Sequence, residues 1–272
     1  MAAHQTRRVN SAKIDLVKKL FYLLTALFLL ALPATVTAEQ ITAFDVIIDI
    51  QTDGQIQVTE KILYDFSDLS RHGIYRDIPL SSKVANKYRN LQITPVEILR
   101  NNQSEPYTTS LKGQLFSFKI GSANTKISST HLYQIRYQVQ NALGNFTTHD
   151  ELYWNVTGND WEIPIQKATA QINSPTTIAP TSSRCFAGSS GDQTACLSHT
   201  TTSFLQENLR PQQGLTIVVT YPPQSFPTSI LSDQPTSSIP DLRIILIFAF
   251  AYILLEVISK PSLSRSRYML VQ

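Results

Sequence analysis

Alternation of apolar and polar side chains is the feature that most restricts the fold of this 272-residue chain. Within residues 131–140, the apolar side chains of Tyr133, Ile135 and Tyr137 fall on one face of an extended segment, and polar side chains fall on the other. Successive side chains of a β-strand point to opposite faces, so the pattern predicts a strand with one buried and one solvated side. The region 39–221 has no comparable helical periodicity.

The same argument predicts nine strands in this region, separated by turn residues such as Thr52-Asp53-Gly54. Short strands at this spacing predict an all-β fold, an antiparallel two-sheet β-sandwich, of which the immunoglobulin-like architecture is one form. Pro95 places its strand at an edge or a bulge, because proline cannot donate to a sheet ladder. The expected strands are 43–50, 55–66, 91–99, 115–120, 131–140, 151–156, 168–173, 184–188 and 215–221.

An apolar segment near the N-terminus predicts export. Residues 20–32 are apolar, follow a lysine-rich start and precede small residues that end at Ala38. These are the three parts of a secretory signal peptide, which we expect at 1–38 with cleavage after Ala38. An uncleaved anchor is the alternative, but 13 apolar residues are few for crossing a bilayer.

A second apolar segment, residues 242–258, would be about 25 Å long as a helix. We expect a transmembrane helix at 241–259, a Pro/Ser-rich stalk at 222–240 and a basic cytoplasmic tail at 260–272, because basic residues without acidic ones mark the cytoplasmic side. A buried core helix is the alternative. The prediction is a single-pass cell-membrane protein with the lipid bilayer around 241–259, the domain 39–221 extracytoplasmic and the C-terminus cytoplasmic.

Charge argues against one class of partner. The whole chain has a net charge of +3, but residues 39–240 contain 14 basic and 17 acidic residues, a net charge of −3. The exported part therefore lacks the basic patch that binding to nucleic acid requires. We expect no nucleic-acid partner.

The chain has two cysteines, Cys185 and Cys196, which flank a turn-like sequence in the exported part. An even pair of cysteines in an oxidising compartment predicts a disulfide, and closing this short loop would contribute about 3 kcal/mol. A zinc site with His199 is a weak alternative, because zinc requires more ligands than these. We expect no metal and no cofactor.

One acidic residue breaks the alternation. Glu60 falls on the same face as Val58 and Ile62, and an isolated buried carboxylate needs a partner. The sequence RHGIYRDIP, residues 71–79, follows soon after and offers two arginines. We expect it to form a structural latch or, as the alternative, a binding loop. The candidate residues are Glu60, Arg71, His72, Gly73, Tyr75, Arg76, Asp77, Asp150 and Glu151.

The segment 149–165, HDELYWNVTGNDWEIPI, supports two further hypotheses. Tyr153, Trp154 and Trp161 could stack on sugar rings, which predicts an envelope receptor for carbohydrate or peptide. Carboxylates near Asp150 could serve a hydrolase, but neighbouring residues of a strand point to opposite faces and cannot converge without a bulge. The chain has no catalytic signature, so the main hypothesis is non-catalytic binding or assembly with an envelope protein or polysaccharide.

Several motifs occur in an order that resembles a known family. They are VTEKILYDF, HGIYRDIP, DELYWNVTGNDWEIPI, CFAG with a later cysteine, and GLTIVVTYP. Together they resemble the N-terminal extracytoplasmic domain of the predicted membrane proteins of domain of unknown function (DUF) 2207, over about residues 40–221. The resemblance implies an exported β-rich domain on a bacterial or archaeal membrane protein, and it implies no known reaction.

Overall fold

The computed structural model describes residues 38–84, 86–236 and 252. The signal peptide expected at 1–38 lies outside these residues except for Ala38, and so do the tail expected at 260–272 and, except for Tyr252, the transmembrane helix expected at 241–259. In the part of the chain that is described, no helix is long and apolar enough to cross a membrane.

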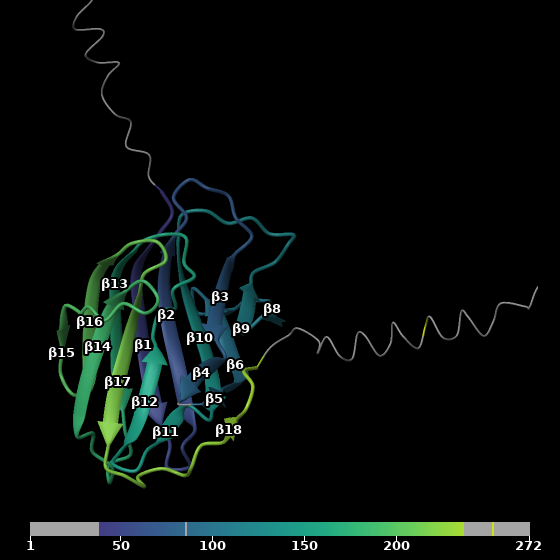
Figure 1. Ribbon diagram of the computed structural model, residues 1–272. Helices are drawn as coiled ribbons and strands as arrows, with labels where there is room; N and C mark the ends of the chain where they lie inside the picture. Colours follow the sequence, from purple (N-terminus) through teal and green to yellow (C-terminus); the bar gives the residue numbers. More distant parts are fainter. Residues whose placement is uncertain (1–37, 85, 237–251, 253–272) are drawn as a thin grey trace, which may run out of the picture. The chain divides into compact units, whose positions relative to one another are not determined.

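The described residues form an all-β fold whose largest sheet has eight strands, in the order β15-β16-β13-β1-β2-β10-β6-β7 (Figure 1). These strands include five of the nine that the alternation predicts, those expected at 43–50, 55–66, 91–99, 131–140 and 168–173. The members are β1 (Gln40–Ile50), β2 (Ile56–Asp65), β6 (Gln92–Arg100), β7 (Gln103–Ser104), β10 (Thr130–Gln140), β13 (Ile165–Asn173), β15 (Ser198–His199) and β16 (Ser203–Leu209). The fifth predicted strand in this sheet is β13, whose start lies three residues before the expected one.

Three smaller sheets complete the described fold, in the orders β11-β12-β17-β14, β3-β9-β8 and β18-β5-β4. The four-stranded sheet contains β11 (Leu143–Asn145), β12 (Asp150–Asn155), β14 (Ser182–Gly188) and β17 (Gly214–Tyr221). The other strands are β3 (Ile74–Pro79), β4 (Ser81–Val84), β5 (Lys87–Asn90), β8 (Tyr107–Lys112), β9 (Leu115–Ile120) and β18 (Leu231–Ser232). All nine predicted strands are confirmed, and the segment 71–79, which we expected to form a latch or a binding loop, contains strand β3.

The expectation of two antiparallel sheets needs correction. The described residues form four sheets, and β1 pairs with β13 in parallel, with Phe44 opposite Ala168 and Ile48 opposite Ile172. Side chains alternate with the same period in parallel and antiparallel strands, so the sequence pattern does not distinguish them. Pro95 lies beside a register shift between β6 and β10, so of the two expected positions, an edge or a bulge, the structure shows the bulge.

One face of the eight-stranded sheet is covered by two of the smaller sheets. The inward side chains of β1, β2 and β10 stand opposite one another and are buried. Trp161, which follows β12, packs edge-on against Phe44 of β1, and Figure 1 shows β12, β14 and β17 in front of this part of the sheet. Phe118 of β9 packs against Tyr137 of β10. The core thus continues from the four-stranded sheet to the β3-β9-β8 sheet.

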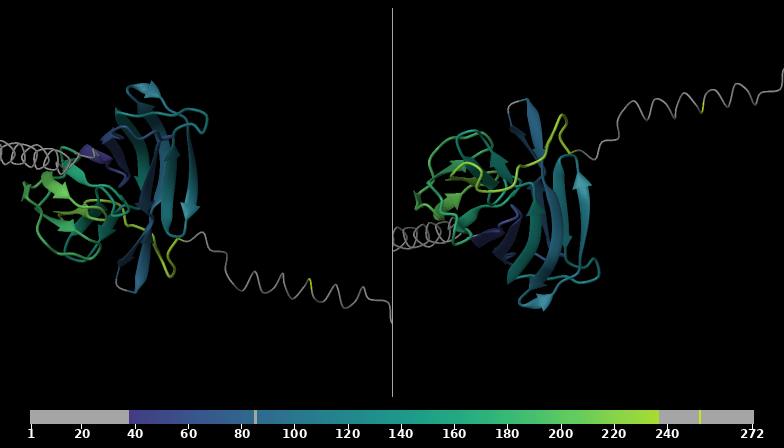
Figure 2. Two further views of the ribbon diagram at one scale, coloured as in Figure 1. Left: turned by 90° about the horizontal axis from the view of Figure 1, so that it is seen from above. Right: turned by 90° about the horizontal axis from the view of Figure 1, so that it is seen from below.

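The segment expected as a stalk, 222–240, lies against the domain as far as it is described. Asp150 and Asn145 accept hydrogen bonds from backbone amides of this segment, at 2.9 Å for Phe226 and 2.7 Å for Ser229. Strand β18 then pairs with β5. Figure 2 shows the β4–β5 hairpin projecting from the rest of the domain with this segment beside it. Residues 222–236 are therefore part of the folded domain.

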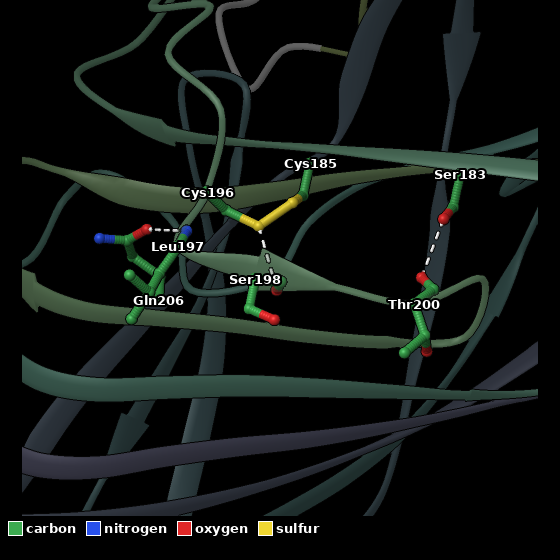
Figure 3. Close-up of a disulfide and its surroundings, with 7 residues drawn as sticks. All are labelled: Ser183, Cys185, Cys196, Leu197, Ser198, Thr200 and Gln206. Atoms are coloured by element: carbon green, nitrogen blue, oxygen red, sulfur yellow. Dashed lines mark hydrogen bonds between the residues drawn. A yellow bond between two sulfur atoms is a disulfide. The ribbon is translucent and has the colours of Figure 1, made fainter.

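A disulfide joins two of the sheets. Cys185 lies in β14 of the four-stranded sheet, and its partner Cys196 lies two residues before β15 of the eight-stranded sheet (Figure 3). Near it, Ser183 Oγ donates a hydrogen bond to the carbonyl oxygen of Thr200 at 2.9 Å. The predicted disulfide is confirmed, and it ties together edge strands that lie in different layers.

Candidate functional site

The acidic residue that breaks the alternation is buried and forms an ion pair with an arginine. Glu60 lies inward on β2, and Arg76 lies inward on β3, so the two face each other across the core. Arg76 Nε and Nη2 donate to the two carboxylate oxygens of Glu60, both at 2.8 Å. The predicted latch forms between these two residues, in the bidentate geometry that makes such pairs strong.

The remaining donors of Arg76 reach three backbone carbonyls. Nη1 donates to Asp77 and Thr157, and Nη2 donates to Val156, at 2.8 to 3.1 Å. A guanidinium has five N–H groups, and all five are used. Val156 and Thr157 directly follow β12. Arg76 therefore connects its own β3-β9-β8 sheet to two others, the end of the four-stranded sheet and strand β2 of the eight-stranded sheet.

Two aromatic rings complete the surroundings of the ion pair. Tyr137 Oη donates to Glu60 Oε1 at 2.6 Å, and the guanidinium of Arg76 lies 5.4 Å from the ring centre of Phe44. Burial alone would lower the pKa of Arg76, but the charge and hydrogen bonds of Glu60 raise it, so the arginine stays charged. Burial and, after it, the charge of Glu60 raise the pKa of Tyr137. The cluster is a complete structural ion pair.

The residues at the start of the motif 71–79 lie at the surface. Arg71 pairs with Glu39 at 2.8 Å, and His72 Nδ1 lies 3.0 Å from the carbonyl oxygen of Thr125. Gly73 has a φ of 137°, and a Cβ there would lie 1.8 Å from the carbonyl oxygen of Ile120, so only glycine fits. These residues position the beginning of β3.

Tyr75 and Asp77 point away from the core on β3. Tyr75 is 53% exposed, and the ammonium of Lys112 lies 4.4 Å from its ring centre. The same lysine is 3.6 Å from the Asp77 carboxylate. The motif therefore divides by alternation into an inward half and an outward half, in which Tyr75 is exposed and Asp77 is largely covered.

The two carboxylates of β12 do not join the ion pair. Asp150 is buried, and its Oδ2 accepts the backbone amide of Phe226 at 2.9 Å. Glu151 points to the opposite face, 3.7 Å from His149. A shared role as acid and base therefore has no support in the geometry, because the two groups lie on opposite sides of the strand.

Two of the three aromatic residues expected at a binding surface are in the core, which corrects that expectation. Trp154 is 3% exposed and Trp161 is 9% exposed, and Trp161 Nε1 donates to the carbonyl oxygen of Thr157 at 2.8 Å. Tyr153 alone of the three is open to solvent, at 48% exposed. Large aromatic side chains contribute much of the buried apolar area of a β-sandwich core, so their presence in the sequence does not show whether Trp154 and Trp161 lie in the core or at a surface.

Tyr153 lies in a pocket of about 430 Å³ on the solvated face of the four-stranded sheet. We call it the sheet pocket. It is lined by Glu151, Tyr153 and Asn155 of β12, Thr216 and Val218 of β17, Arg184 and Phe186 of β14, and the loop from Gly188 to Gln193. Strand pairing places Tyr153, Val218 and Arg184 side by side in one row. The loop that overhangs the pocket lies between the two cysteines of the disulfide.

His199 lies near the disulfide, but the arrangement does not suit a metal. The sulfur atoms of Cys185 and Cys196 are bonded to each other and are not thiolate ligands. The His199 ring instead stacks on Phe204, with a ring-centre distance of 6.0 Å. The disulfide and the His199–Phe204 stack lie at the edges of the two sheets.

One buried arginine, Arg89, has no signature in the sequence. Arg89 of β5 is 3% exposed and lines a second cavity, of about 270 Å³, together with Trp154 and Tyr153. Strand β5 has four residues, too few for an alternation that could reveal a buried arginine. Arg184 of the sheet pocket was not predicted from the sequence either, because an isolated basic residue on an exposed strand face has no distinguishing pattern.

The fold and these sites define an all-β domain with a buried ion pair at its centre and a polar pocket on one sheet. The chain belongs to the family of predicted membrane proteins described by the DUF2207 N-terminal domain, which matches residues 40–221. It is 33% identical over 132 residues to the uncharacterized protein YciQ of Escherichia coli (strain K12), a match that covers 47% of this chain and 21% of that protein. The chain thus spans about a fifth of the length of this relative.

Two solved structures show distant similarity. Leukotriene A4 hydrolase from Saccharomyces cerevisiae is 8% identical with a TM-score of 0.42, and the match covers 68% of this chain and 30% of the hydrolase. A zinc metallopeptidase from Deinococcus radiodurans is 12% identical with a TM-score of 0.38, covering 67% and 42% of the two chains. At these scores the similarity carries no argument about activity.

Proposed function

We propose that the domain is a non-catalytic binding module whose ligand lies in the sheet pocket. The observation that supports this most directly is the lining of the pocket, where the exposed ring of Tyr153 lies in one row with Arg184. Binding sites typically combine an aromatic surface with a few polar groups that fix the orientation of the ligand. Tyr153 offers a ring face, while Arg184 and Glu151 offer charged hydrogen-bonding groups. This chemistry suits an envelope polysaccharide or an extended peptide.

The binding proposal can be tested with a pair of tyrosine variants. Tyr153 and Tyr75 are similarly exposed, at 48% and 53%, but lie on different sheets. The full chain would be applied to arrays of envelope polysaccharides and of peptides, and Tyr153→Ala should weaken the signal roughly tenfold or more, as loss of a central aromatic contact does. Tyr75→Ala should leave it unchanged. The absence of a binding signal on both arrays, or an equal loss of signal in the two variants, would contradict the proposal.

We also propose that this module is exported and anchored in the cell membrane by the segment 241–259, with 1–38 removed as a signal peptide and 260–272 in the cytoplasm. The disulfide between Cys185 and Cys196 supports export, because disulfides persist in oxidising compartments. The description of the family as predicted membrane proteins agrees with a membrane location.

The topology has a direct test. N-terminal sequencing of the chain isolated from membranes should begin at Glu39, and protease added outside the cytoplasmic membrane should digest the domain while a tag after Gln272 survives. A sequence that begins at Met1 would show that residues 1–38 are retained. Digestion of the tag and protection of the domain would reverse the proposed orientation.

A further inference from the structure

A second cavity lies next to the sheet pocket, and we call it the Arg89 cavity. It has a volume of about 270 Å³ and shares Tyr153, Asn155 and Ser190 with the sheet pocket. Its other walls come from the end of β3, the beginning of β4, and β5. Strand β11 pairs with β12 only as far as Leu152, so the part of β12 that lines the cavity has a paired neighbour on one side only.

Arg89 lies in the wall of this cavity with an incomplete set of hydrogen bonds. Its Nη1 donates to the carbonyl oxygen of Ala142 at 3.3 Å, which is long for such a bond. Its Nε is buried and has no hydrogen-bond partner among the described residues. No carboxylate of the described chain lies within ion-pair distance of it. Burial lowers the pKa of Arg89, an effect that the more distant charge of Glu151 partly opposes.

The chain makes room for this arginine by omitting a side chain. A Cβ at Gly144 would lie 2.0 Å from Arg89 Nη2 and 2.8 Å from Cζ. The guanidinium therefore lies directly against the backbone of β11, in a space that glycine leaves open. A buried charge at this position, with donors unused, is costly for folding alone.

A second residue that lines the same cavity, Trp154, also has a donor unused by the described residues. Trp154 Nε1 is buried and has no hydrogen-bond partner in the part of the chain that is described. The other tryptophan of the chain, Trp161, donates to a backbone carbonyl. Several buried polar atoms of the described residues have no hydrogen-bond partner, but among the residues that line this cavity there are two, both of them donors and both in need of an acceptor.

We propose that the Arg89 cavity binds the carboxylate group of an acidic ligand. Arg89 supplies one positive charge and a forked pair of donors, and Trp154 supplies a neutral N–H, which together match a planar anion of single charge. A doubly charged phosphate would leave an unbalanced negative charge near Glu151. The proposal rests on the proposed function. Because the two cavities share lining residues, the carboxylate would be one end of a ligand whose remainder lies in the sheet pocket.

The indole N–H signals of the two tryptophans provide the test. In the isotope-labelled full chain, titration with propionate should shift the Trp154 signal in a saturable way and leave the Trp161 signal in place. Propionamide has the same shape without the charge and should bind roughly tenfold more weakly or worse, since hydrogen bonds to charged groups are the stronger ones. Sodium chloride at equal ionic strength controls for salt, and Trp161→Phe assigns the signals.

Two variants of Arg89 test whether the response of the Trp154 signal depends on this arginine. Arg89→Met should abolish the response to propionate while an unchanged Trp161 signal reports that the domain is folded, and Arg89→Lys should retain part of the response. A Trp154 signal that does not move with propionate, or that moves equally with propionamide, overturns the carboxylate site. The array experiment with Tyr153→Ala is independent of this result, so the sheet pocket can stand when the carboxylate site fails.

Two matched pairs of probes distinguish a carboxylate at the end of a peptide from the carboxylate of an acidic sugar. N-acetyl-dialanine and its C-terminal amide represent a peptide end, and galacturonic acid and galactose represent an acidic sugar. In each pair the acid should bind more tightly than its neutral partner in the unmodified chain, and Arg89→Met should remove the difference. The pair with the larger ratio identifies the class of ligand, and ratios of one in both pairs overturn the proposal.

Discussion

Two arginines of this domain are buried to nearly the same degree, and their surroundings differ. Arg76 is 1% exposed and uses all five N–H groups, two of them on the Glu60 carboxylate. Arg89 is 3% exposed and has a buried Nε without a partner among the described residues. One arginine lies in the middle of the core, and the other lies in the wall of a cavity.

The difference separates a structural charge from a functional one. Removing an arginine from water costs several kcal/mol, which a bidentate carboxylate and a full set of hydrogen bonds can offset. At Arg76 this compensation is complete within the chain. At Arg89 this compensation is incomplete, and the free-energy cost of burying the charge is fully offset only when a ligand supplies the missing acceptor. The motif around Arg76 is thus a feature of the fold, whereas the less conspicuous arginine marks the site.

The largest expected effect is the loss of Arg76. Arg76→Met should lower the free energy of unfolding by about 3–5 kcal/mol, because it leaves the Glu60 carboxylate buried without a partner. Denaturant titration followed by fluorescence of the two buried tryptophans measures this. The matched variant Arg89→Met should change the stability by less than about 1 kcal/mol or raise it, since it removes an uncompensated charge.

The double variant Glu60→Leu with Arg76→Met completes this experiment. It removes both charges and should recover most of the stability that Arg76→Met loses, because apolar residues can replace a buried ion pair. Equal losses for Arg76→Met and Arg89→Met would show that the two arginines do not differ as proposed.

The next effect concerns two tyrosines of β10 that are both fully buried. Tyr137→Phe should cost about 1.5–3 kcal/mol, because Glu60 loses a charge-assisted hydrogen bond of 2.6 Å. Tyr133 has a buried hydroxyl without a partner in the described part of the chain, so Tyr133→Phe should be neutral or stabilising. Thermal and denaturant unfolding of both variants measure the difference, and similar losses in the two would argue against a special role for the Glu60 cluster.

Alkaline pH should weaken the region around the ion pair. Burial and the charge of Glu60 raise the pKa of Tyr137 in the folded state above its ordinary value of 10.0. The folded chain therefore holds this proton when the unfolded chain releases it, and the stability that is present below pH 10 falls as the pH rises. Tyr137→Phe should reduce the slope of stability against pH by about 1.4 kcal/mol per pH unit in this range. An unchanged slope would show that Tyr137 ionises in the folded state.

The smallest expected change in stability comes from a substitution that fills the space beside Arg89. Gly144→Ala should cost on the order of 1 kcal/mol, because the new methyl group overlaps the guanidinium. In a chain that already carries Arg89→Ala the same substitution should cost less, because only the contact with the Phe146 ring at 3.1 Å remains, and the difference isolates the contact between positions 89 and 144. An undiminished cost in the double variant would show that the strain comes from the Phe146 ring or the backbone of β11 and not from Arg89.

Much of the ion pair was predictable from sequence, and the Arg89 cavity was not. Glu60 interrupts a ten-residue strand whose other inward positions are apolar, so its need for a partner is visible in the pattern. Arg76 was one of two nearby arginines, and the choice between them depended on β3 being a strand that points Arg76 inward and leaves Arg71 at the surface. Arg89 and Trp154 lie 65 residues apart in sequence, and only the packing of β5 beside β12 brings them to one cavity.

By itself the sequence determined the all-β class, the positions of nine strands, the disulfide between Cys185 and Cys196 and the anomaly at Glu60. These features depend on local alternation, on turn residues and on a single pair of cysteines, and each is contained in a short stretch of chain. The tertiary structure decided the number of sheets, the parallel pairing of β1 with β13 and the burial of both tryptophans. The physical reason is that the alternation shows which side of a strand is buried, while the neighbour that buries it is chosen by contacts between distant segments.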